Sequence, residues 1–372
     1  MMTTVGIVGL GTMGLGIALV YAQAGHPVLA TDAVEAARHS APDRLHAALE
    51  PRVAKGQMTA AERDAVLSQI TVVDGPEAMG AAALVIEAII ERLEAKQALF
   101  RALESAAQDA VLATNTSSLP VGAIAAGLDR PARLIGLHFF NPAQAMKLVE
   151  LIGPPGVDPD ALALARRLTE GAGKTVIACP DRPGFIVNRC ARPYYGEALA
   201  MVEEGRSPGE IDAAMQASGY RLGPFALIDL VGADINLAAT QGLSSAMHGH
   251  PRYHVFDRLA AQAASGDLGR KTGRGFVFPE ATPPAPPDAA ELAARIETTL
   301  ANEAGWLLAE GGVTGAGIDT AMKLGLNFPR GPFEIIAALG RDQIAARLAA
   351  LEAAAPAHLR GRYLPAPALR HP

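Results

Sequence analysis

The stretch Val5–Gly14 reads VGIVGLGTMG and decides the fold of the first half of this 372-residue chain. An apolar strand pattern runs into a glycine-rich turn, and an apolar helical pattern follows it. In such a turn Gly9 permits the tight bend, Gly11 lets the backbone approach a pyrophosphate, and Gly14 lets the helix pack on the strand. The phosphates then lie at the helix N-terminus, where amide groups and the helix dipole favour negative charge. The stretch therefore predicts a dinucleotide-binding βα unit.

Asp32 supports this reading and indicates which dinucleotide binds. It directly follows the next apolar run, Pro27–Thr31, and lies 18 residues beyond Gly14. An acid at that place accepts a hydrogen bond from the ribose 2′-hydroxyl and repels a 2′-phosphate, so we expect NAD rather than NADP. The bland alternative is a glycine-rich turn without a ligand. The residues expected to bind the cofactor through this unit are Gly9, Gly11, Thr12, Met13, Gly14 and Asp32.

Short apolar runs alternate with amphipathic stretches as far as residue 178. That rhythm predicts a mostly parallel sheet covered by helices on both faces, an α/β Rossmann-type domain over residues 1–181. The expected strands are Val5–Leu10, Pro27–Thr31, Ile70–Val73, Ala83–Ile89, Ala110–Thr114 and Arg133–Phe139, with Lys147–Ile152 and Lys174–Ala178 added at the end.

After Pro183 the strand patterns stop. Gly184–Glu204 is expected to form one long helix, within an all-α domain over residues 182–280. A Pro-rich linker over residues 281–290 leads to a second, degenerate copy of that domain over residues 291–372. The copies align because Asp212 and Asp319 lie 107 positions apart and the two GPF triplets lie 108 apart. No second GxGxxG or HFFNP string accompanies the repeat, so only the helical domain is duplicated.

Composition excludes several classes of function. The net charge is −6 and no basic run of five or more residues is present, which argues against nucleic acid and anionic membranes as partners. The apolar run Ala81–Ile90 is interrupted by Glu87 and is too short to span a bilayer. Cys179 and Cys190 have no metal-ligand spacing, so no metal is expected. The first strand pattern begins by Thr4, which leaves no room for a signal peptide, and a cytoplasmic protein is predicted.

Two polar strings follow predicted strands, NTSSLP at Asn115–Pro120 and HFFNP at His138–Pro142. Ligands of open α/β sheets bind beyond the carboxyl ends of the strands, so both strings should lie near the cofactor. Oxidising an alcohol needs a base that titrates near neutral pH, for which histidine is the usual choice. Taken singly, a histidine at a strand end is more often a packed or solvated residue, and NTSS is typical of a turn.

Together with PGFIVNR at Pro183–Arg189 and the helical repeat, these strings resemble the L-3-hydroxyacyl-CoA dehydrogenase family over nearly the whole chain. The string ARPYY at Ala191–Tyr195 is similar to bacterial members with two helical units, which include 3-hydroxyadipyl-CoA dehydrogenases. The resemblance implies NAD-dependent oxidation of (S)-3-hydroxyacyl-CoA thioesters, in fatty acid or phenylacetate-type catabolism. It leaves the acyl group open between hydroxybutyryl, hydroxyadipyl and longer chains.

The resemblance also assigns roles to residues. His138 would be the general base, and Glu150 would bond the other imidazole nitrogen. Ser117 would contact the substrate oxygen, and Asn188 would hold the same oxygen or the thioester. Glu87 and Asn115 would line the nicotinamide ribose.

Weaker signals concern the CoA part of the substrate. Lys55 and Arg52 end a helical stretch and would meet the CoA phosphates, although a solvated helix end is an equal reading. Arg270, Lys271 and Arg274 in GRKTGRGF would touch a nucleotide phosphate or only solvent.

The family usually has a proline before the MKLVE string, whereas this chain has Ala143-Gln144-Ala145. This loop borders the substrate, so the departure bears on chain-length preference.

Two other functions remain open from the sequence: a dehydrogenase of free hydroxy or sugar acids on the same scaffold, and a non-catalytic NAD-binding protein. The expected partner of the leading hypothesis is an acyl-CoA thioester. Family members with one helical unit pair two of them across a dimer axis. The second copy is therefore expected to pack on the first as an intrachain pseudo-dimer, with a further homo-oligomer still possible.

Overall fold

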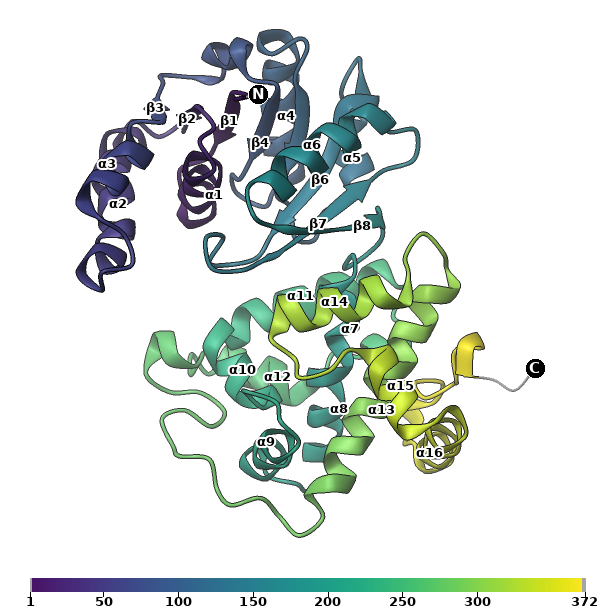
Figure 1. Ribbon diagram of the computed structural model, residues 1–372. Coiled ribbons are helices and arrows are strands. Elements are labelled where there is room, and N and C mark those ends of the chain that lie inside the picture. Colours follow the sequence, from purple (N-terminus) through teal and green to yellow (C-terminus); the bar gives the residue numbers. More distant parts are fainter. Residues whose placement is uncertain (1, 370–372) are drawn as a thin grey trace. The chain divides into compact units, whose positions relative to one another are not determined.

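The computed structural model describes residues 2–369 and divides the chain into two compact units (Figure 1). Unit 1 ends at Arg182 and unit 2 begins at Pro183, next to the predicted boundary at residue 181. The predicted second helical copy reaches residue 372, and its last three residues lie outside the described part of the chain.

Unit 1 is built on an eight-stranded sheet in the order β3-β2-β1-β4-β5-β6-β7-β8. Every neighbouring pair is parallel except β6 and β7, which run antiparallel. The Rossmann-type prediction is confirmed. The strands are β1 (Val5–Val8), β2 (Val28–Thr31), β3 (Ile70–Val72), β4 (Leu84–Glu87), β5 (Val111–Thr114), β6 (Leu134–Phe139), β7 (Leu148–Gly153) and β8 (Thr175–Pro180).

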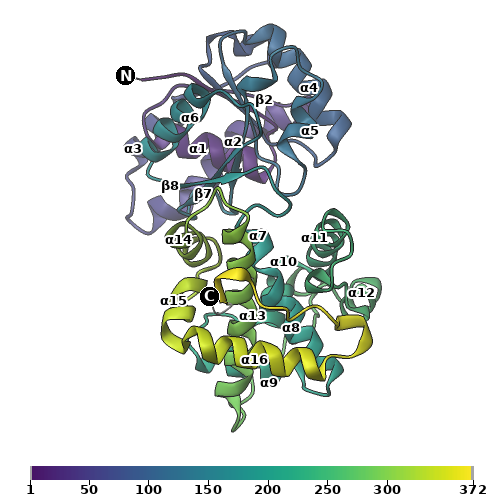
Figure 2. The same ribbon diagram turned by 90° about the vertical axis from the view of Figure 1, so that its right-hand side faces the viewer.

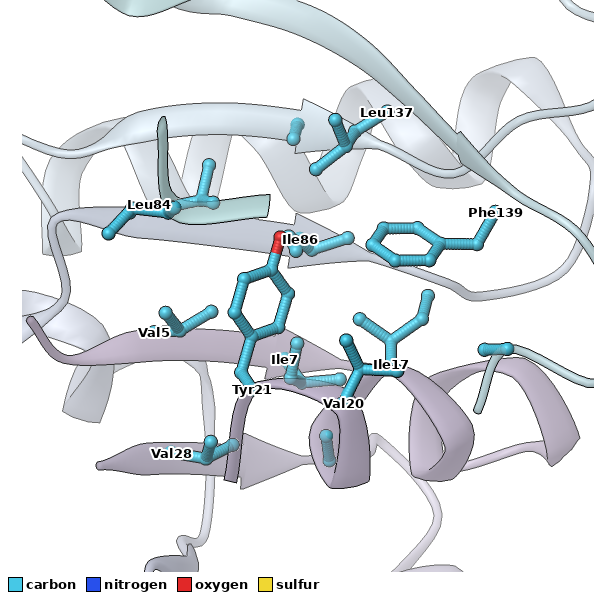
Figure 3. Close-up of a cluster of buried hydrophobic side chains, with 14 of the residues drawn as sticks. Val5, Ile7, Ile17, Val20, Tyr21, Val28, Leu84, Ile86, Leu137 and Phe139 are labelled. Carbon is cyan, nitrogen blue, oxygen red and sulfur yellow. The ribbon is translucent and has the colours of Figure 1, made fainter. Parts of the chain in front are cut away.

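Helices connect these strands and cover the sheet. They are α1 (Thr12–Gln23), α2 (Glu35–Ala54), α3 (Ala60–Leu67), α4 (Leu93–Ala106), α5 (Val121–Ala125) and α6 (Pro159–Gly171), with short 3₁₀ turns at Pro76–Ala81 and Pro131–Arg133. Figure 3 shows Val5 and Ile7 of β1 packed with Ile17 of α1 and Phe139 of β6. The hydroxyl of Tyr21 reaches Thr169 of α6 at 2.8 Å, which ties α1 to α6. This core fixes the ends of β1, β4, β5 and β6, where the polar motifs stand.

Unit 2 is helical. Its helices are α7 (Val187–Cys190), α8 (Arg192–Glu203), α9 (Pro208–Ala217), α10 (Pro224–Val231), α11 (Ala233–Ala246), α12 (Asp257–Ala264), α13 (Ala289–Ala309), α14 (Gly315–Leu326), α15 (Pro332–Leu339) and α16 (Arg341–Ala354). Short 3₁₀ turns lie at Pro251–Tyr253, Arg270–Thr272, Ala357–Leu359 and Pro367–Leu369. The expectation of one helix over Gly184–Glu204 was wrong, because the helix is interrupted at Ala191. Pro193 has no amide hydrogen for the carbonyl one turn back, so it starts α8 instead of continuing α7.

The two halves of unit 2 repeat their elements. The helices α9, α10 and α11 recur as α14, α15 and α16. Asp212 of α9 accepts hydrogen bonds from the amides of Phe225 and Ala226 at 2.9 and 2.7 Å and so caps α10. Asp319 of α14 accepts from the amide of Phe333 at 2.7 Å and caps α15 in the same way. Because each aspartate caps the helix that begins at its own GPF triplet, the spacing between the two aspartates nearly equals the spacing between the two triplets.

The long helix α13 packs against α8 and α9 and lies at the centre of unit 2 (Figure 2). Two buried ion pairs join the halves of unit 2, and each is the counterpart of the other. Arg189 of the first half bonds Glu303 of the second at 2.8 Å, and Arg295 of the second half bonds Glu197 of the first at 2.7 Å. The two arginines lie 106 positions apart, as do the two glutamates. The two ion pairs are therefore equivalent, as they would be across a two-fold axis that relates the two copies.

The same pattern extends around both glutamates. Glu303 also accepts from Arg252 and Tyr253, at 3.0 and 2.6 Å. Glu197 also accepts from Arg362 and Tyr363, at 3.2 and 3.1 Å. Each half thus supplies two arginines and one tyrosine to the carboxylate of the other.

No helix in residues 2–369 is both long and apolar enough to cross a membrane. Within the same described range, no group of three or more His, Cys, Asp or Glu residues could hold a metal ion.

Candidate active site

The glycine-rich turn between β1 and α1 is shaped for a ligand. Gly9 has a φ of +104°, and a Cβ on it would come within 2.5 Å of the Ala88 carbonyl oxygen. A Cβ on Gly14 would lie 1.7 Å from the Gly9 carbonyl oxygen, so protein packing demands glycine at both places. A Cβ on Gly11 would meet nothing within 4 Å, and its φ of −69° suits any residue. The space beside Gly11 therefore fits the close approach of a pyrophosphate, while Thr12 and Met13 open α1.

Asp32 stands just past the end of β2 and turns toward this loop. Its Oδ2 accepts a hydrogen bond from the amide of Leu10 at 2.7 Å, and its Oδ1 accepts from the amide of Val34 at 2.8 Å. Arg44 donates to the carbonyl of Leu10 at 2.8 Å, so both polar groups of the Leu10 backbone are bonded to side chains. The carboxylate is partly exposed beside the phosphate loop, where a ribose would lie.

The predicted contact of Glu87 with the nicotinamide ribose is not supported by its burial. Its side chain is 0% exposed, and its oxygens accept from Lys96 at 2.5 Å, Thr114 at 2.7 Å and the amide of Ile89 at 2.7 Å. The contact of Glu87 with the ribose stays a prediction, and in this structure both carboxylate oxygens are enclosed and hydrogen-bonded within the protein. Glu87 instead holds the ends of β4 and β5 together.

Glu91 is a site residue that the sequence reasoning missed. Its Oε1 accepts hydrogen bonds from the Thr116 hydroxyl at 2.7 Å and from the amide of Ser117 at 2.9 Å, and its Oε2 lies 3.2 Å from Lys96 Nζ. Burial alone would raise the pKa of Glu91, but Lys96 and the hydroxyl and amide donors of the loop hold it below its usual value. Glu91 and Lys96 thus fix the NTSS loop. Their five-residue spacing after an apolar strand was the only sequence signal.

Asn115 and Ser117 lie where the sequence placed them, at the carboxyl end of β5. The Asn115 Oδ1 accepts from the amide of Phe139 at 2.8 Å, which joins the NTSS loop to the strand that carries His138. Ser117 is exposed, and its hydroxyl lies 3.4 Å from Glu91.

His138 and Glu150 form a buried pair. They face each other across the antiparallel strands β6 and β7 in direct register. The imidazole Nδ1 lies 2.7 Å from Glu150 Oε2, and the two side chains are 7% and 0% exposed. Glu150 lies twelve positions after His138, and the chain between them makes a loop and a return strand. A carboxylate held at this distance fixes the proton on Nδ1 and leaves Nε2 able to take a proton from a substrate.

The remaining predicted residues are spread over both units. Asn188 lies in α7 of unit 2. Lys55 is exposed at the end of α2, with Arg52 one turn earlier, as an anion-binding or solvated helix end would be. In the basic loop, Lys271 forms an ion pair with Asp234 at 2.6 Å and Arg274 lies 3.5 Å from Asp267. Those two cations are therefore already paired within unit 2.

Comparison with known proteins assigns the family. The family model described as 3-hydroxyacyl-CoA dehydrogenase, NAD binding domain, matches residues 4–182. The model described as 3-hydroxyacyl-CoA dehydrogenase, C-terminal domain, matches residues 184–278 and again residues 292–371. The chain belongs to the 3-hydroxyacyl-CoA dehydrogenase family. This is a family of NAD-using oxidoreductases, and the predictions of family and cofactor are confirmed.

Individual relatives extend the match. The chain is 43% identical to a 3-hydroxyadipyl-CoA dehydrogenase of Escherichia coli K12 over 73% of its length, which spans 58% of that relative. It is 38% identical to a 3-hydroxybutyryl-CoA dehydrogenase of Mycobacterium tuberculosis over 73% of its length and 96% of that protein. The crystal structure of a 3-hydroxybutyryl-CoA dehydrogenase from E. coli K12 matches with a TM-score of 0.92 and 32% identity, over 99% of this chain and 98% of that one.

Proposed function

We propose that this protein oxidises (S)-3-hydroxyacyl-CoA thioesters to 3-oxoacyl-CoA, with His138 as general base. The observation that carries the proposal is the buried His138–Glu150 pair at 2.7 Å, at the same sheet edge as the glycine-rich loop. Bound NAD⁺ would supply the acceptor for the hydride from C3. His138 Nε2 takes the proton of the 3-hydroxyl, and Glu150 stabilises the imidazolium that results.

The other residues of the site would orient the substrate. Ser117, held by Glu91, offers a hydroxyl to the reacting oxygen. Asn188 would hold that oxygen or the thioester. Gly9, Gly11, Gly14 and Asp32 would hold the cofactor, and Glu87 and Lys96 would support the loop that presents Ser117.

Replacing His138 with alanine should reduce turnover by roughly 10²- to 10⁴-fold while NAD affinity changes little, because the histidine handles the proton and not the cofactor. NADH formation from 3-hydroxybutyryl-CoA and NAD titration measure the two quantities. Glu150→Gln, which keeps the shape of the side chain, should also slow turnover. A His138→Ala variant with more than half of wild-type turnover would remove the assignment.

The other two functions predict different results. A dehydrogenase of free hydroxy acids would oxidise the free acid as well as its CoA ester. A non-catalytic NAD-binding protein would oxidise neither and would be indifferent to loss of His138. The enclosed His–Glu pair favours the enzyme, since a binding protein has no use for a base beside the cofactor.

We propose further that residues 291–372 act as a built-in partner for residues 182–280. The reciprocal pairs Arg189–Glu303 and Arg295–Glu197 support this, because in a two-fold contact residue i meets j and j meets i. The face that would join two chains is then covered within one chain. This role is structural, and it leaves a single active site per chain.

A further inference from the structure

Lys174 is a half-buried cation of unit 1 that no carboxylate of the described chain neutralises. It directly precedes β8, and its Nζ donates to three backbone carbonyls of the loop that joins β6 to β7. The acceptors are Ala143 at 2.5 Å, Met146 at 2.8 Å and Gln144 at 3.4 Å. Burial lowers the pKa of Lys174. An ammonium group has three N–H donors and no acceptor, so this loop can engage all of its hydrogen-bonding capacity.

Lys96, in the same unit, shows what a buried lysine has when its charge is balanced. It is 1% exposed, and its Nζ lies 2.5 Å from Glu87 and 3.2 Å from Glu91. Taking a cation out of water costs free energy unless a counter-ion or hydrogen bonds offset the loss. Lys174 has only the carbonyls of the loop for this purpose, so its position is explained by what it does to that loop.

The loop has the form of a single helical turn. The amides of Ala145 and Met146 both donate to the carbonyl of Pro142, each at 3.0 Å. A turn of this kind leaves its last carbonyls without partners inside the turn. Lys174 supplies donors at that place, as lysine side chains do at the C-terminal ends of helices. One side chain therefore holds the shape of the turn.

The sheet fixes the backbone from which Lys174 reaches the loop. The next residue, Thr175, is paired with Leu148 in the parallel ladder of β7 and β8. The amide of Thr175 also donates to the carbonyl of Lys147 at 2.7 Å. The ammonium is thus held by the strand that lies beside the one carrying Glu150.

The same loop packs against the helix that begins at the glycine-rich turn. Ala143 is 2% exposed and belongs to the core of unit 1 together with residues of α1. A Cβ on Gly16 would lie 3.1 Å from the Ala143 Cβ and 3.2 Å from Gln144 Oε1, so the helix and the loop are about as close as a glycine allows. Gly16 is in the second turn of α1, five positions after Gly11. The loop therefore contacts the proposed cofactor helix near the end that would hold the pyrophosphate.

The loop also connects the two members of the buried pair. His138 lies on the strand that enters it and Glu150 on the strand that leaves it. Proton and hydride transfer require the base, the alcohol and the nicotinamide to be held in one geometry, and a misplacement of about 1 Å can cost 10²-fold in rate. A contact that fixes this loop on α1 acts on that geometry from outside the site.

We propose that Lys174 is a positioning residue for the oxidation. Through the three carbonyls it holds residues 143–146 against α1, and so keeps His138 in place relative to the cofactor that α1 binds. The inference rests on the proposed function. Lys174 acts only through the loop and exchanges no proton with the substrate.

A cavity beside Lys174 makes the inference testable by chemical rescue. The cavity has a volume of about 340 Å³, and Val20, Gln144 and Lys147 also line it. Lys174→Ala removes the atoms of one propylammonium ion. The variant should lose roughly tenfold in kcat with 3-hydroxybutyryl-CoA while its Kd for NAD⁺ stays within about threefold, because the glycine-rich turn keeps its own contacts. Added propylammonium should restore most of the lost kcat, whereas tetramethylammonium, which has the charge but no N–H donor, should restore none.

Lys147→Met is the matched control. Lys147 is exposed and lines the same cavity, and its ammonium has no hydrogen-bond or ion-pair partner within residues 2–369. The control removes the same charge from the same place without removing a donor to the loop. Its kcat should equal that of wild type, with or without either amine.

A Lys174→Ala variant with the kcat of wild type would overturn the inference. So would a variant that loses NAD⁺ affinity as much as kcat, or one whose Tm but not kcat is restored by propylammonium, because either result makes Lys174 a structural residue only. If Lys174→Ala does not fold, Lys174→Met keeps the unbranched stem and should show the same loss of kcat at unchanged NAD⁺ affinity; if neither folds, the role is structural and the inference fails. A wild-type protein that oxidises no 3-hydroxyacyl-CoA would instead overturn the proposed function.

Discussion

The two helical copies of unit 2 differ in what they retain. Both keep the arginine and glutamate of the cross-pairs, and both keep the aspartate that caps the GPF helix. The second copy has lost Asn188, which becomes Ala294, and Arg192, which becomes Thr298. It has also lost Asp229, which binds the amides of Phe276, Val277 and Phe278 in the first copy and corresponds to Ala337. The pairs that join the copies therefore recur in both, whereas Asn188, the residue proposed to hold the substrate, and Asp229, which binds loop amides, occur only in the first copy.

The largest expected effect is the loss of stability when the ion pairs between the two copies are removed. Arg189 is 1% exposed and bonds Glu303 and Glu310, so Arg189→Met should reduce the free energy of unfolding by about 3–5 kcal/mol, because both carboxylates lose this cation, although Glu303 keeps its bond to Arg252. Arg295→Met should have the same sign and a smaller size, since the Arg295 side chain is 17% exposed. Urea unfolding followed by circular dichroism measures both. If either variant is as stable as wild type, the two contacts are not equivalent.

The next largest effect is on activity, and it should follow a substitution in the first copy but not one at the matching position of the second. Asn188→Ala should lower kcat/KM by roughly 10²-fold, as removal of one hydrogen-bond donor at a reacting oxygen does. The reciprocal change Ala294→Asn should do nothing, because no base or cofactor loop is assigned to the second copy. Initial rates with 3-hydroxybutyryl-CoA give both numbers. Activity that fell in Ala294→Asn and survived in Asn188→Ala would reverse the assignment of the copies.

A smaller effect concerns pH. Burial raises the pKa of Asp212 to about 7, although the amides of Phe225 and Ala226 act to lower it. Between about pH 4 and 7 the Asp212 carboxyl is therefore protonated in the folded protein and ionised in the unfolded chain. The stability that Asp212 contributes consequently falls as pH rises through this range. The stability of wild type relative to Asp212→Asn should fall by roughly 1–3 kcal/mol from pH 4.5 to pH 8.

Asp319 provides the matched comparison. Burial raises its pKa as well, but it is 8% exposed against 2% for Asp212, so Asp319→Asn should remove a weaker dependence of the same sign. Thermal unfolding of both variants at the two pH values tests this. If the stability of wild type relative to either variant rose with pH, the predicted direction of the pH dependence would be contradicted.

The sequence predicted the sheet because strand periodicity and the GLGTMG turn are local signals, and the eight expected strands are all present. Family strings placed His138 and Glu150, and the register of β6 and β7 brings them together. The ribose contact given to Glu87 stays a prediction, and the ion pair that encloses its carboxylate could not be foreseen because Lys96 belongs to the following helix. The ion pairs Arg189–Glu303 and Arg295–Glu197 could not be predicted, because each joins residues about 100 positions apart and local sequence patterns do not indicate such contacts.

The number of substrate sites per chain tests the account most directly. One Rossmann-type unit and one intact helical copy predict that calorimetric titration with NAD⁺, followed by a 3-oxoacyl-CoA, gives one site for each per chain. The His138→Ala variant should bind both ligands with the same stoichiometry, because its loss affects proton transfer. Two acyl-CoA sites per chain would show that the second copy still binds substrate and would contradict the division of roles between the copies.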